Sequence, residues 1–323
     1  MAEATDTPLA ASPSLNLDLT AALPGDGRAG GGRPEDAEVG RSRRLLLENL
    51  RVYTGNRIAL AGALFLVLVL LFCYVGPLLY QTNQISTNLI NGNLAPSPSH
   101  LLGTSPEGRD ILGRLMLGGQ ATLEVALAVA AIATVFGTLW GAIAGLVGGV
   151  LDAVMMRIVD AMLSIPFLFF VVLLAALVQP SLPVIILAIA SVSWLSTARL
   201  VRGEVLSLRT RDYVAAARCF GGGSWRIVFR HLLPNALGVV VVNGTLKVAD
   251  AILTFAAISF LGLGVPPPAT SWGQMLTTGI NNLFNGYWWE LWPAGVLIVL
   301  TVIAINVMGD GLRDVVEKRL QQR

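Results

Sequence analysis

The chain has 323 residues, of which 54% are hydrophobic and only 13% are charged. Soluble domains carry about a quarter charged residues, so the composition indicates a membrane protein, as does the mean hydropathy of +0.68. A net charge of +2 gives no reason to expect a nucleic-acid partner. The two lysines form no Walker A loop, and the two cysteines and two histidines form no zinc motif. We therefore expect no enzymatic activity and no bound cofactor or metal.

The N-terminal region differs from the rest of the chain. Residues 1–40 are rich in Ala, Gly, Pro, Ser and Asp and show no hydrophobic periodicity, so we expect a disordered cytoplasmic tail. Residues 41–57 contain five arginines around a cluster of leucines. This pattern predicts a basic amphipathic segment at the membrane surface.

The remainder, 58–323, is expected to form one domain with six membrane-spanning helices. A helix of about 20 apolar residues crosses a bilayer, and segment 161–198 is long enough for two, divided at Gln179-Pro180-Ser181-Leu182-Pro183. Glycines at 137, 141, 145 and 148 allow close helix packing. The predicted spans are 58–80, 125–151, the two halves of 161–198, 236–261 and 291–308. The predicted fold class is an all-α membrane protein.

The distribution of arginine orients these spans. Segment 41–57 holds five arginines and segment 199–230 holds seven, whereas the opposite side has only Arg109 and Arg114. The positive-inside rule places both termini and the loop 199–235 in the cytoplasm. Four of the seven tryptophans lie within 263–292, where we expect an interfacial aromatic belt on the outer side.

The cytoplasmic loop 199–235 is the longest inner connection. Its sequence predicts a short helix after Asp212, a break at Gly221, a second short helix and a stop at Pro234. An alanine-rich helix flanked by arginines can dock in the groove of a partner. The alternative is a solvated positive loop that has no partner.

This loop resembles the EAA motif of importer-type ABC permeases, a coupling segment that sits in a cleft of the ATPase subunit. The motif runs Glu-Ala-Ala, three residues, Gly, and then a hydrophobic and basic stretch that closes in Leu-Pro. Ala215 stands in place of the glutamate, so the polar contact of that glutamate must be absent or replaced. The resemblance assigns coupling to Ala215, Ala216, Ala217, Gly221, Arg226, His231 and Pro234.

Further segments extend the resemblance over residues 45–320, to the C subunits of oligopeptide and dipeptide permeases. The sequence GRD at Gly108, Arg109 and Asp110 is similar to the family's external signature, and 148–160 is similar to its GGxxDxxxMRxxD stretch. The segments SFLGLG at 259–264 and GDGLRD at 309–314 are also similar. Phe255 departs from the family, which often has glutamate there.

The charged residues in these segments have structural interpretations as well. Arg109 and Asp110 are expected either to hold an external helix against the membrane surface or to form an ordinary interfacial ion pair. Asp152 and Asp160 flank a predicted cytoplasmic turn, in which Arg157 and Asp160 are spaced to pair.

Lys247 and Asp250 lie inside the fifth predicted span, where a charge costs about 2.5–3.5 kcal/mol. Their i,i+3 spacing places them on one helix face, so we expect the two charges to neutralise each other. The alternative is that both line the transport pathway and meet the charged termini of a peptide.

The resemblance implies a permease subunit, with the type I ABC importer fold, that translocates peptides across a bacterial cytoplasmic (inner) membrane. The implied partners are a homologous second permease subunit, two ATP-binding subunits that hold ATP and Mg²⁺, an extracellular solute-binding protein and membrane lipid. Nickel chelates and glutathione-like peptides are alternative substrates within the family. A stand-alone secondary transporter or channel is the alternative from another class, but we detect none of the inverted repeats expected of one.

Overall fold

The computed structural model describes residues 56–321, except for positions 180, 222, 228, 229 and 231. The predicted tail at 1–40, nearly all of the basic segment 41–57, and His231 lie outside the described residues. The described residues belong to one unit, 48–323, and they form helices without a β-strand. Five helices are long and apolar enough to cross a membrane, or six if one bent pair counts as a single span. The predicted all-α membrane fold is confirmed.

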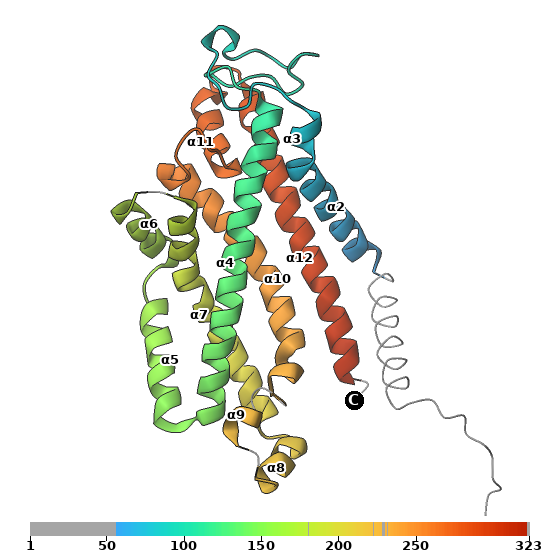
Figure 1. Ribbon diagram of the computed structural model, residues 1–323, viewed down its shortest axis with the longest axis vertical. Coiled ribbons are helices and arrows are strands. Elements are labelled where there is room, and N and C mark those ends of the chain that lie inside the picture. Colours follow the sequence, from blue (N-terminus) through green and yellow to red (C-terminus); the bar gives the residue numbers. More distant parts are fainter. Residues whose placement is uncertain (1–55, 180, 222, 228–229, 231, 322–323) are drawn as a thin grey trace, which may run out of the picture. The chain divides into compact units, whose positions relative to one another are not determined.

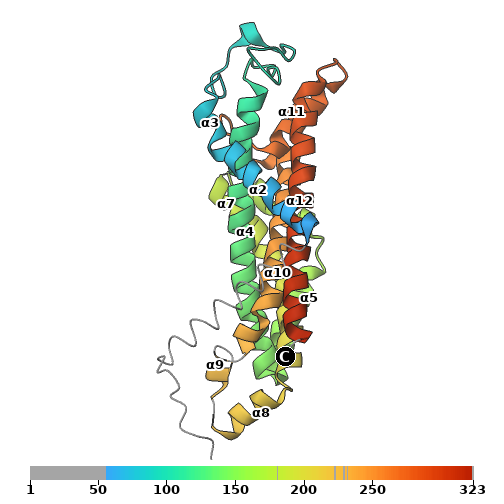
Figure 2. The same ribbon diagram turned by 90° about the vertical axis from the view of Figure 1, so that its right-hand side faces the viewer.

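The long helices run side by side, and shorter elements gather at their two ends (Figures 1 and 2). One end carries α11 and the chain between α3 and α4, and we call it the α11 end. The other carries α8 and α9 and is called the α8 end. The helices are α2 (Arg57–Tyr74), α3 (Gly76–Leu79), α4 (Ile111–Val147), α5 (Gly149–Leu163), α6 (Phe167–Leu177), α7 (Leu182–Leu208), α8 (Asp212–Cys219), α9 (Ser224–Ile227), α10 (Leu233–Ile258), α11 (Trp272–Leu283) and α12 (Trp292–Gln321).

Helix α4 is longer than the second predicted span, because it begins at Ile111 rather than near Val125. The Asp110 side chain caps the helix by accepting the backbone N–H of Gly113 at 2.9 Å. With 37 residues, α4 is about 55 Å long at 1.5 Å per residue. It therefore extends well beyond a hydrocarbon layer of about 30 Å.

The third predicted span, the first half of 161–198, contains only the last residues of α5 and the short helix α6. These two helices meet at an angle of 81°, beside the middle of α7. The break falls at Ser164-Ile165-Pro166, because the residue before a proline is disfavoured in the α conformation. Asp152, Arg157 and Asp160 consequently lie within α5 and not around a turn, which corrects the prediction.

The loop predicted at 199–235 begins too early, because α7 continues as a helix through Leu208. Pro234 does not end the second short helix either. It lies in the first turn of α10, where a backbone N–H has no helical partner and its absence costs nothing. The connection between α7 and α10 is therefore shorter than predicted and consists mainly of α8 and α9.

The α4–α7 contact is close because glycines of α4 face the α7 backbone. A Cβ atom on Gly137 would lie 2.7 Å from the carbonyl oxygen of Trp194, and one on Gly141 would overlap the carbonyl oxygen of Ala198. The indole of Trp194 packs on that of Trp140 with ring centroids 5.0 Å apart. The predicted role of these glycines in packing is confirmed, and Gly148 instead forms the turn between α4 and α5.

The predicted tryptophan belt is only half correct. Trp288 and Trp292 are exposed, with exposed fractions of 53% and 58%. Trp272 is fully buried and donates its indole N–H to the Leu115 carbonyl at 2.9 Å, and Trp289 is 8% exposed. These two tryptophans hold α11 and its flanking segments to the bundle, instead of anchoring it in lipid.

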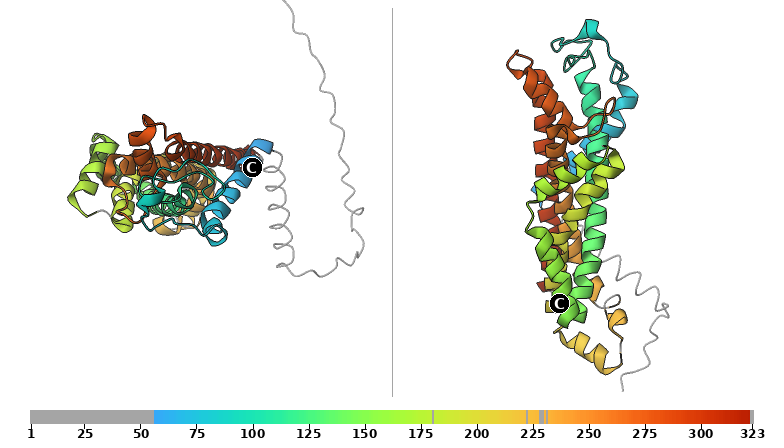
Figure 3. Two further views of the ribbon diagram at one scale, coloured as in Figure 1. Left: turned by 90° about the horizontal axis from the view of Figure 1, so that it is seen from above. Right: turned by 90° about the vertical axis from the view of Figure 1, so that its left-hand side faces the viewer.

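The termini of the described region meet at one side of the bundle. Asn56 donates its side-chain amide to the Asp314 carboxylate at 3.3 Å, and α2 lies on the opposite side of the unit from α5 and α6 (Figure 3). The start of α2 and the end of α12 therefore lie together.

We expect Gly141→Val to destabilise the protein by on the order of 1–3 kcal/mol or more, because the new side chain separates α4 from α7. Gly203→Val is the matched control, since Gly203 lies in α7 and a Cβ there meets nothing within 4 Å. The thermal unfolding midpoint in detergent measures both. Equal midpoints would show that this contact does not hold the bundle together.

Candidate coupling and pathway sites

Helices α8 and α9 dock on the α8 ends of α4, α7 and α10. Val214 of α8, Ile227 of α9 and Leu232 are at most 2% exposed. They share a hydrophobic cluster with Val201 and Val205 of α7, and the cluster also includes Ala142 of α4 and Val240 of α10. Burial of three aliphatic side chains contributes several kcal/mol at about 1.5–3 kcal/mol each. A displacement of α8 therefore acts directly on three long helices.

One face of α8 and the turn after it expose small and aromatic side chains. Ala215 and Ala216 are exposed, whereas Ala217 is half-buried against the cluster. Phe220 is 90% exposed. Phe220 lies in the turn directly after α8, and an exposed phenylalanine next to small exposed residues is suited to insertion into the groove of a partner.

The predicted break between the two short helices is confirmed. Gly221 has φ = +75°, in the left-handed region that favours glycine, and a Cβ atom there would meet nothing within 4 Å. Glycine is therefore favoured at 221 by its backbone conformation, and not by a lack of space for a side chain. Arg226 lies on α9 and is exposed, so the described members of the predicted coupling set share one end of the molecule, with His231 outside the described residues.

Two ion pairs fasten α5 to α7. Arg202 donates from Nε and Nη2 to the two carboxylate oxygens of Asp152 at 2.6 and 2.7 Å, in the bidentate geometry that favours arginine. Arg199 binds Asp160. The predicted Arg157–Asp160 pair is therefore wrong, because Asp160 turns toward the neighbouring helix. The spacing rule misled the prediction because it considers only one helix, whereas these carboxylates face α7.

Lys247 and Asp250 form the predicted ion pair, with Nζ 3.0 Å from Oδ2. Their exposures differ strongly: the Lys247 side chain is 14% exposed and the Asp250 side chain is 65% exposed. Both line a pocket of about 330 Å³, together with the hydroxyl-bearing Ser193 and Ser196 of α7 and Thr254 of α10. The end of α5 and the start of α6 close one side of this pocket with Leu163 and Phe167.

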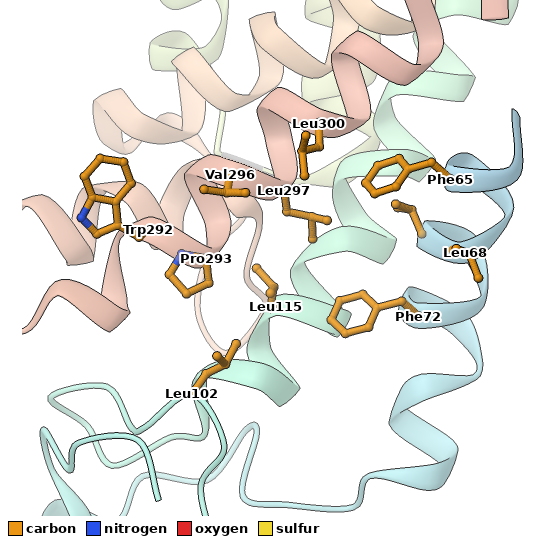
Figure 4. Close-up of a pocket in the computed structure, with 11 residues that line it drawn as sticks. Phe65, Leu68, Phe72, Leu102, Leu115, Trp292, Pro293, Val296, Leu297 and Leu300 are labelled. Carbon is orange, nitrogen blue, oxygen red and sulfur yellow. The ribbon is translucent and has the colours of Figure 1, made fainter. Parts of the chain in front are cut away.

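A second pocket, of about 480 Å³, lies between α2, α4 and α12 and is lined only by apolar side chains. Figure 4 shows Phe65 and Phe72 of α2 facing Leu297 of α12 across it. Apart from the indole N–H of Trp292, the side chains that line this pocket offer no polar group with which to orient a charged or polar substrate. The Lys247–Asp250 pocket is therefore the better candidate for substrate contact.

At the α11 end, Asp110 is fully buried and organises the external signature. Its Oδ2 accepts the Tyr80 hydroxyl at 3.1 Å and lies 2.9 Å from Nδ1 of His100. Burial, reinforced by the Asp110 carboxylate, raises the pKa of the Tyr80 hydroxyl. The hydroxyl therefore remains protonated and donates.

The other signature residues serve the same loop. Gly108 has φ = +70°, and a Cβ atom there would overlap the Asn88 carbonyl. Arg109 donates to Thr87 at 3.3 Å, and Asp110 pairs with His100, so the alternative of an ordinary Arg109–Asp110 ion pair is wrong. The signature fixes the loop that precedes α4, which is a structural role.

The burial of two charges was not predicted. Arg114, 6% exposed, donates to Thr270 at 3.2 Å, and its Nη1 lies 3.7 Å from the Glu107 carboxylate. Glu290 is 2% exposed and accepts the Asn282 amide at 2.8 Å, while its other oxygen has no partner. The sequence signal was an arginine within the apolar run at 111–118, but nothing in the sequence shows which groups surround it.

No group of three or more His, Cys, Asp or Glu side chains is placed to hold a metal ion among the described residues. The features that remain for function are the α8–α9 segment, the Lys247–Asp250 pocket and the ordered loops of the α11 end.

Comparison with known families agrees with this arrangement. Residues 137–322 match the family described as "Binding-protein-dependent transport system inner membrane component". Residues 46–96 match the family described as "N-terminal TM domain of oligopeptide transport permease C". The first match includes α8, α9 and the Lys247–Asp250 pocket, and the second includes α2.

Individual relatives resemble nearly the whole chain. The oligopeptide transport system permease protein OppC of Salmonella typhimurium is 44% identical over 287 residues, which are 88% of this chain and 94% of that protein. OppC of Escherichia coli K12 is 43% identical over the same shares. The dipeptide transport system permease protein DppC of Bacillus subtilis is 38% identical over 267 residues, 83% of either chain. The chain is thus a multi-pass membrane protein that belongs to the family of binding-protein-dependent transport system inner membrane components.

Proposed function

We propose that this chain is a permease subunit of an ATP-driven importer that moves peptides across the bacterial cytoplasmic membrane. The relatives named above are permeases of oligopeptide and dipeptide transport systems. The observation that carries the proposal is the α8–α9 segment, which is anchored on three long helices and presents an exposed face. Such a segment suits a chain that receives force from a partner and performs no chemistry of its own.

The partners in this proposal are a second homologous permease subunit, two ATP-binding subunits and an extracellular solute-binding protein. ATP and Mg²⁺ belong to the ATP-binding subunits, because this chain has no Walker A loop. The face formed by Ala215, Ala216 and Phe220 docks on one of them. The loops at the α11 end face the solute-binding protein.

Coupling follows from the packing. The ATP-binding subunit moves α8, and the cluster around Val214 passes that movement to α4, α7 and α10. The Arg202–Asp152 and Arg199–Asp160 pairs carry α5 along with α7. Because packed interfaces shift between discrete arrangements rather than deform continuously, this linkage moves the inner ends of the helices as a unit.

The orientation of the chain is part of the proposal. Seven arginines lie in 199–230, which includes the α8 end, and the positive-inside rule places such a segment in the cytoplasm. The start of α2 lies beside the end of α12, so both termini are assigned to the cytoplasm as well.

The chemistry of the pocket favours peptides over the alternatives. It contains one cation, one anion and three hydroxyl groups, a set suited to a zwitterionic substrate, including glutathione-like peptides. A nickel chelate is less well served, although its carboxylates would still find Lys247. A stand-alone secondary transporter is disfavoured because the α8–α9 face would have no use in it, and the described residues contain one broken span rather than a pair.

The orientation is tested with two exposed phenylalanines at opposite ends. In a Cys219→Ser background, we expect a membrane-impermeant thiol reagent to label Phe284→Cys in intact cells but not Phe220→Cys. The native side chains are 95% and 90% exposed, so both cysteines must react once the membrane is made permeable without unfolding the protein. Labelling of Phe220→Cys alone in intact cells would invert the proposed orientation.

The coupling segment is tested at Gly221. We expect Gly221→Val to leave the protein in the membrane but to reduce ATP-dependent peptide uptake at least ten-fold, because a β-branched residue is strained at φ = +75°. Gly221→Asn tolerates this conformation and should retain most uptake. Gly223→Val is the matched control, since Gly223 has open space and no positive φ. Wild-type uptake by the Gly221→Val complex would refute the proposed coupling role.

A further inference from the structure

A charged side chain is exposed in the middle of a membrane-spanning helix. Asp250 lies near the centre of the apolar segment Leu233–Leu263, and its side chain is 65% exposed. A carboxylate at the bilayer centre costs about 2.5–3.5 kcal/mol, and such groups almost always face the bundle interior or a water-filled cavity. The contact with Lys247 does not bury the Asp250 carboxylate, since the side chain is 65% exposed with that contact in place. This face of α10 therefore does not face lipid.

The pocket around Asp250 is arranged as a set of hydrogen-bond acceptors with a single cation. Thr254 donates its hydroxyl to the Asp250 backbone carbonyl at 2.8 Å. Ser193 and Ser196 likewise donate to carbonyls of α7, at 2.8 and 3.5 Å. Because the three hydroxyl protons point to the helices, the oxygen lone pairs are available to accept hydrogen bonds from a ligand. Lys247 supplies the positive charge.

A peptide complements this set through groups that every peptide has. Its ammonium terminus and backbone N–H groups match the Asp250 carboxylate and the hydroxyl oxygens, and its carboxylate terminus matches Lys247. These contacts ignore the peptide's side chains, which suits a substrate class of varied sequence. At about 330 Å³, the pocket is near the lower limit for a small-molecule site. A pocket of this size does not enclose a peptide.

We propose that the pocket formed by α7, α10 and the α5–α6 break is one wall of the translocation pathway, in which the Lys247–Asp250 pair transiently contacts the charged groups of a passing peptide. This proposal rests on the proposed function, because it takes a peptide as the substrate. The ion pair serves both states of the pathway. When the pathway is empty, Lys247 and Asp250 neutralise each other. When a peptide passes, its charged groups replace this contact for a short time. The α5–α6 break lets the pathway wall move with α7, to which α5 is fastened by Arg202 and Arg199.

The test compares two cysteines at similar depth in the complete transport complex, in a Cys219→Ser background. Ser196→Cys lies in the pocket and Val135→Cys on the exposed apolar surface of α4, where the native side chain is 62% exposed. Thiols react as thiolates, which form in water and not in an apolar setting. We expect a charged methanethiosulfonate reagent to modify Ser196→Cys at least ten-fold faster than Val135→Cys, and trialanine to slow the pocket reaction during ATP turnover.

Two results would overturn the proposal. One is a Ser196→Cys rate no higher than that of Val135→Cys. The other is a Ser196→Cys rate that trialanine leaves unchanged in a complex that imports trialanine. Uptake of trialanine by the unmodified complex is measured separately and reports on the proposed function. Failure of uptake with a fast, accessible Ser196→Cys would contradict the peptide as substrate but not the water-filled passage.

Charge variants supply the second arm. Lys247→Met and Asp250→Leu should each lower the amount of assembled complex, because each leaves its partner's charge unpaired. The double variant should assemble but import trialanine at least ten-fold more slowly per complex, whereas Asp250→Glu, which keeps the carboxylate, should slow uptake less than the double variant does. Wild-type uptake per complex by the double variant would show that the pair is only structural. If the double variant fails to assemble, the cysteine rates decide the question.

Discussion

The close contact between α4 and α7 determines where both candidate sites lie. Gly137 and Gly141 bring the α4 backbone against that of α7, closer than any side chain would allow. In a membrane, where lipid is as apolar as the helix surface, such van der Waals contact is what holds helices together. The α8–α9 segment rests on the α8 ends of these two helices and of α10. The Lys247–Asp250 pocket lies between α7 and α10.

Charges at the α8 end of the bundle extend this arrangement. Asp152 and Asp160 of α5 bind Arg202 and Arg199 of α7, so the bent pair α5–α6 follows the helix that leads into α8. At the other end, Asp110 organises the loop before α4, and the buried Trp272 joins α11 to the same helix. Helices α4 and α7 thus form a frame between the loop-rich α11 end and the α8 end.

The sequence predicted the membrane class, the approximate number of spans and the helix-break-helix pattern at Gly221, because these depend on local composition and chain chemistry. The three-residue spacing also predicted the Lys247–Asp250 contact. It failed for Asp160, whose partner Arg199 lies on another helix. The expected aromatic belt failed for Trp272, since an aromatic residue at a membrane boundary can face either lipid or protein. The 81° bend was missed because the apolar run continues through Pro166. The exposure of the Asp250 side chain could not be predicted from the sequence, because it depends on how the helices pack.

Accumulation of trialanine by proteoliposomes tests the central claim most directly, which is that this chain converts work done by ATP-binding partners into movement of a peptide. The vesicles hold the complete complex, with nucleotide on the α8 side and the solute-binding protein on the α11 side. The account predicts accumulation above the external concentration with ATP and none with ADP. Equal accumulation with ADP, or accumulation by vesicles that hold this chain alone, would contradict it.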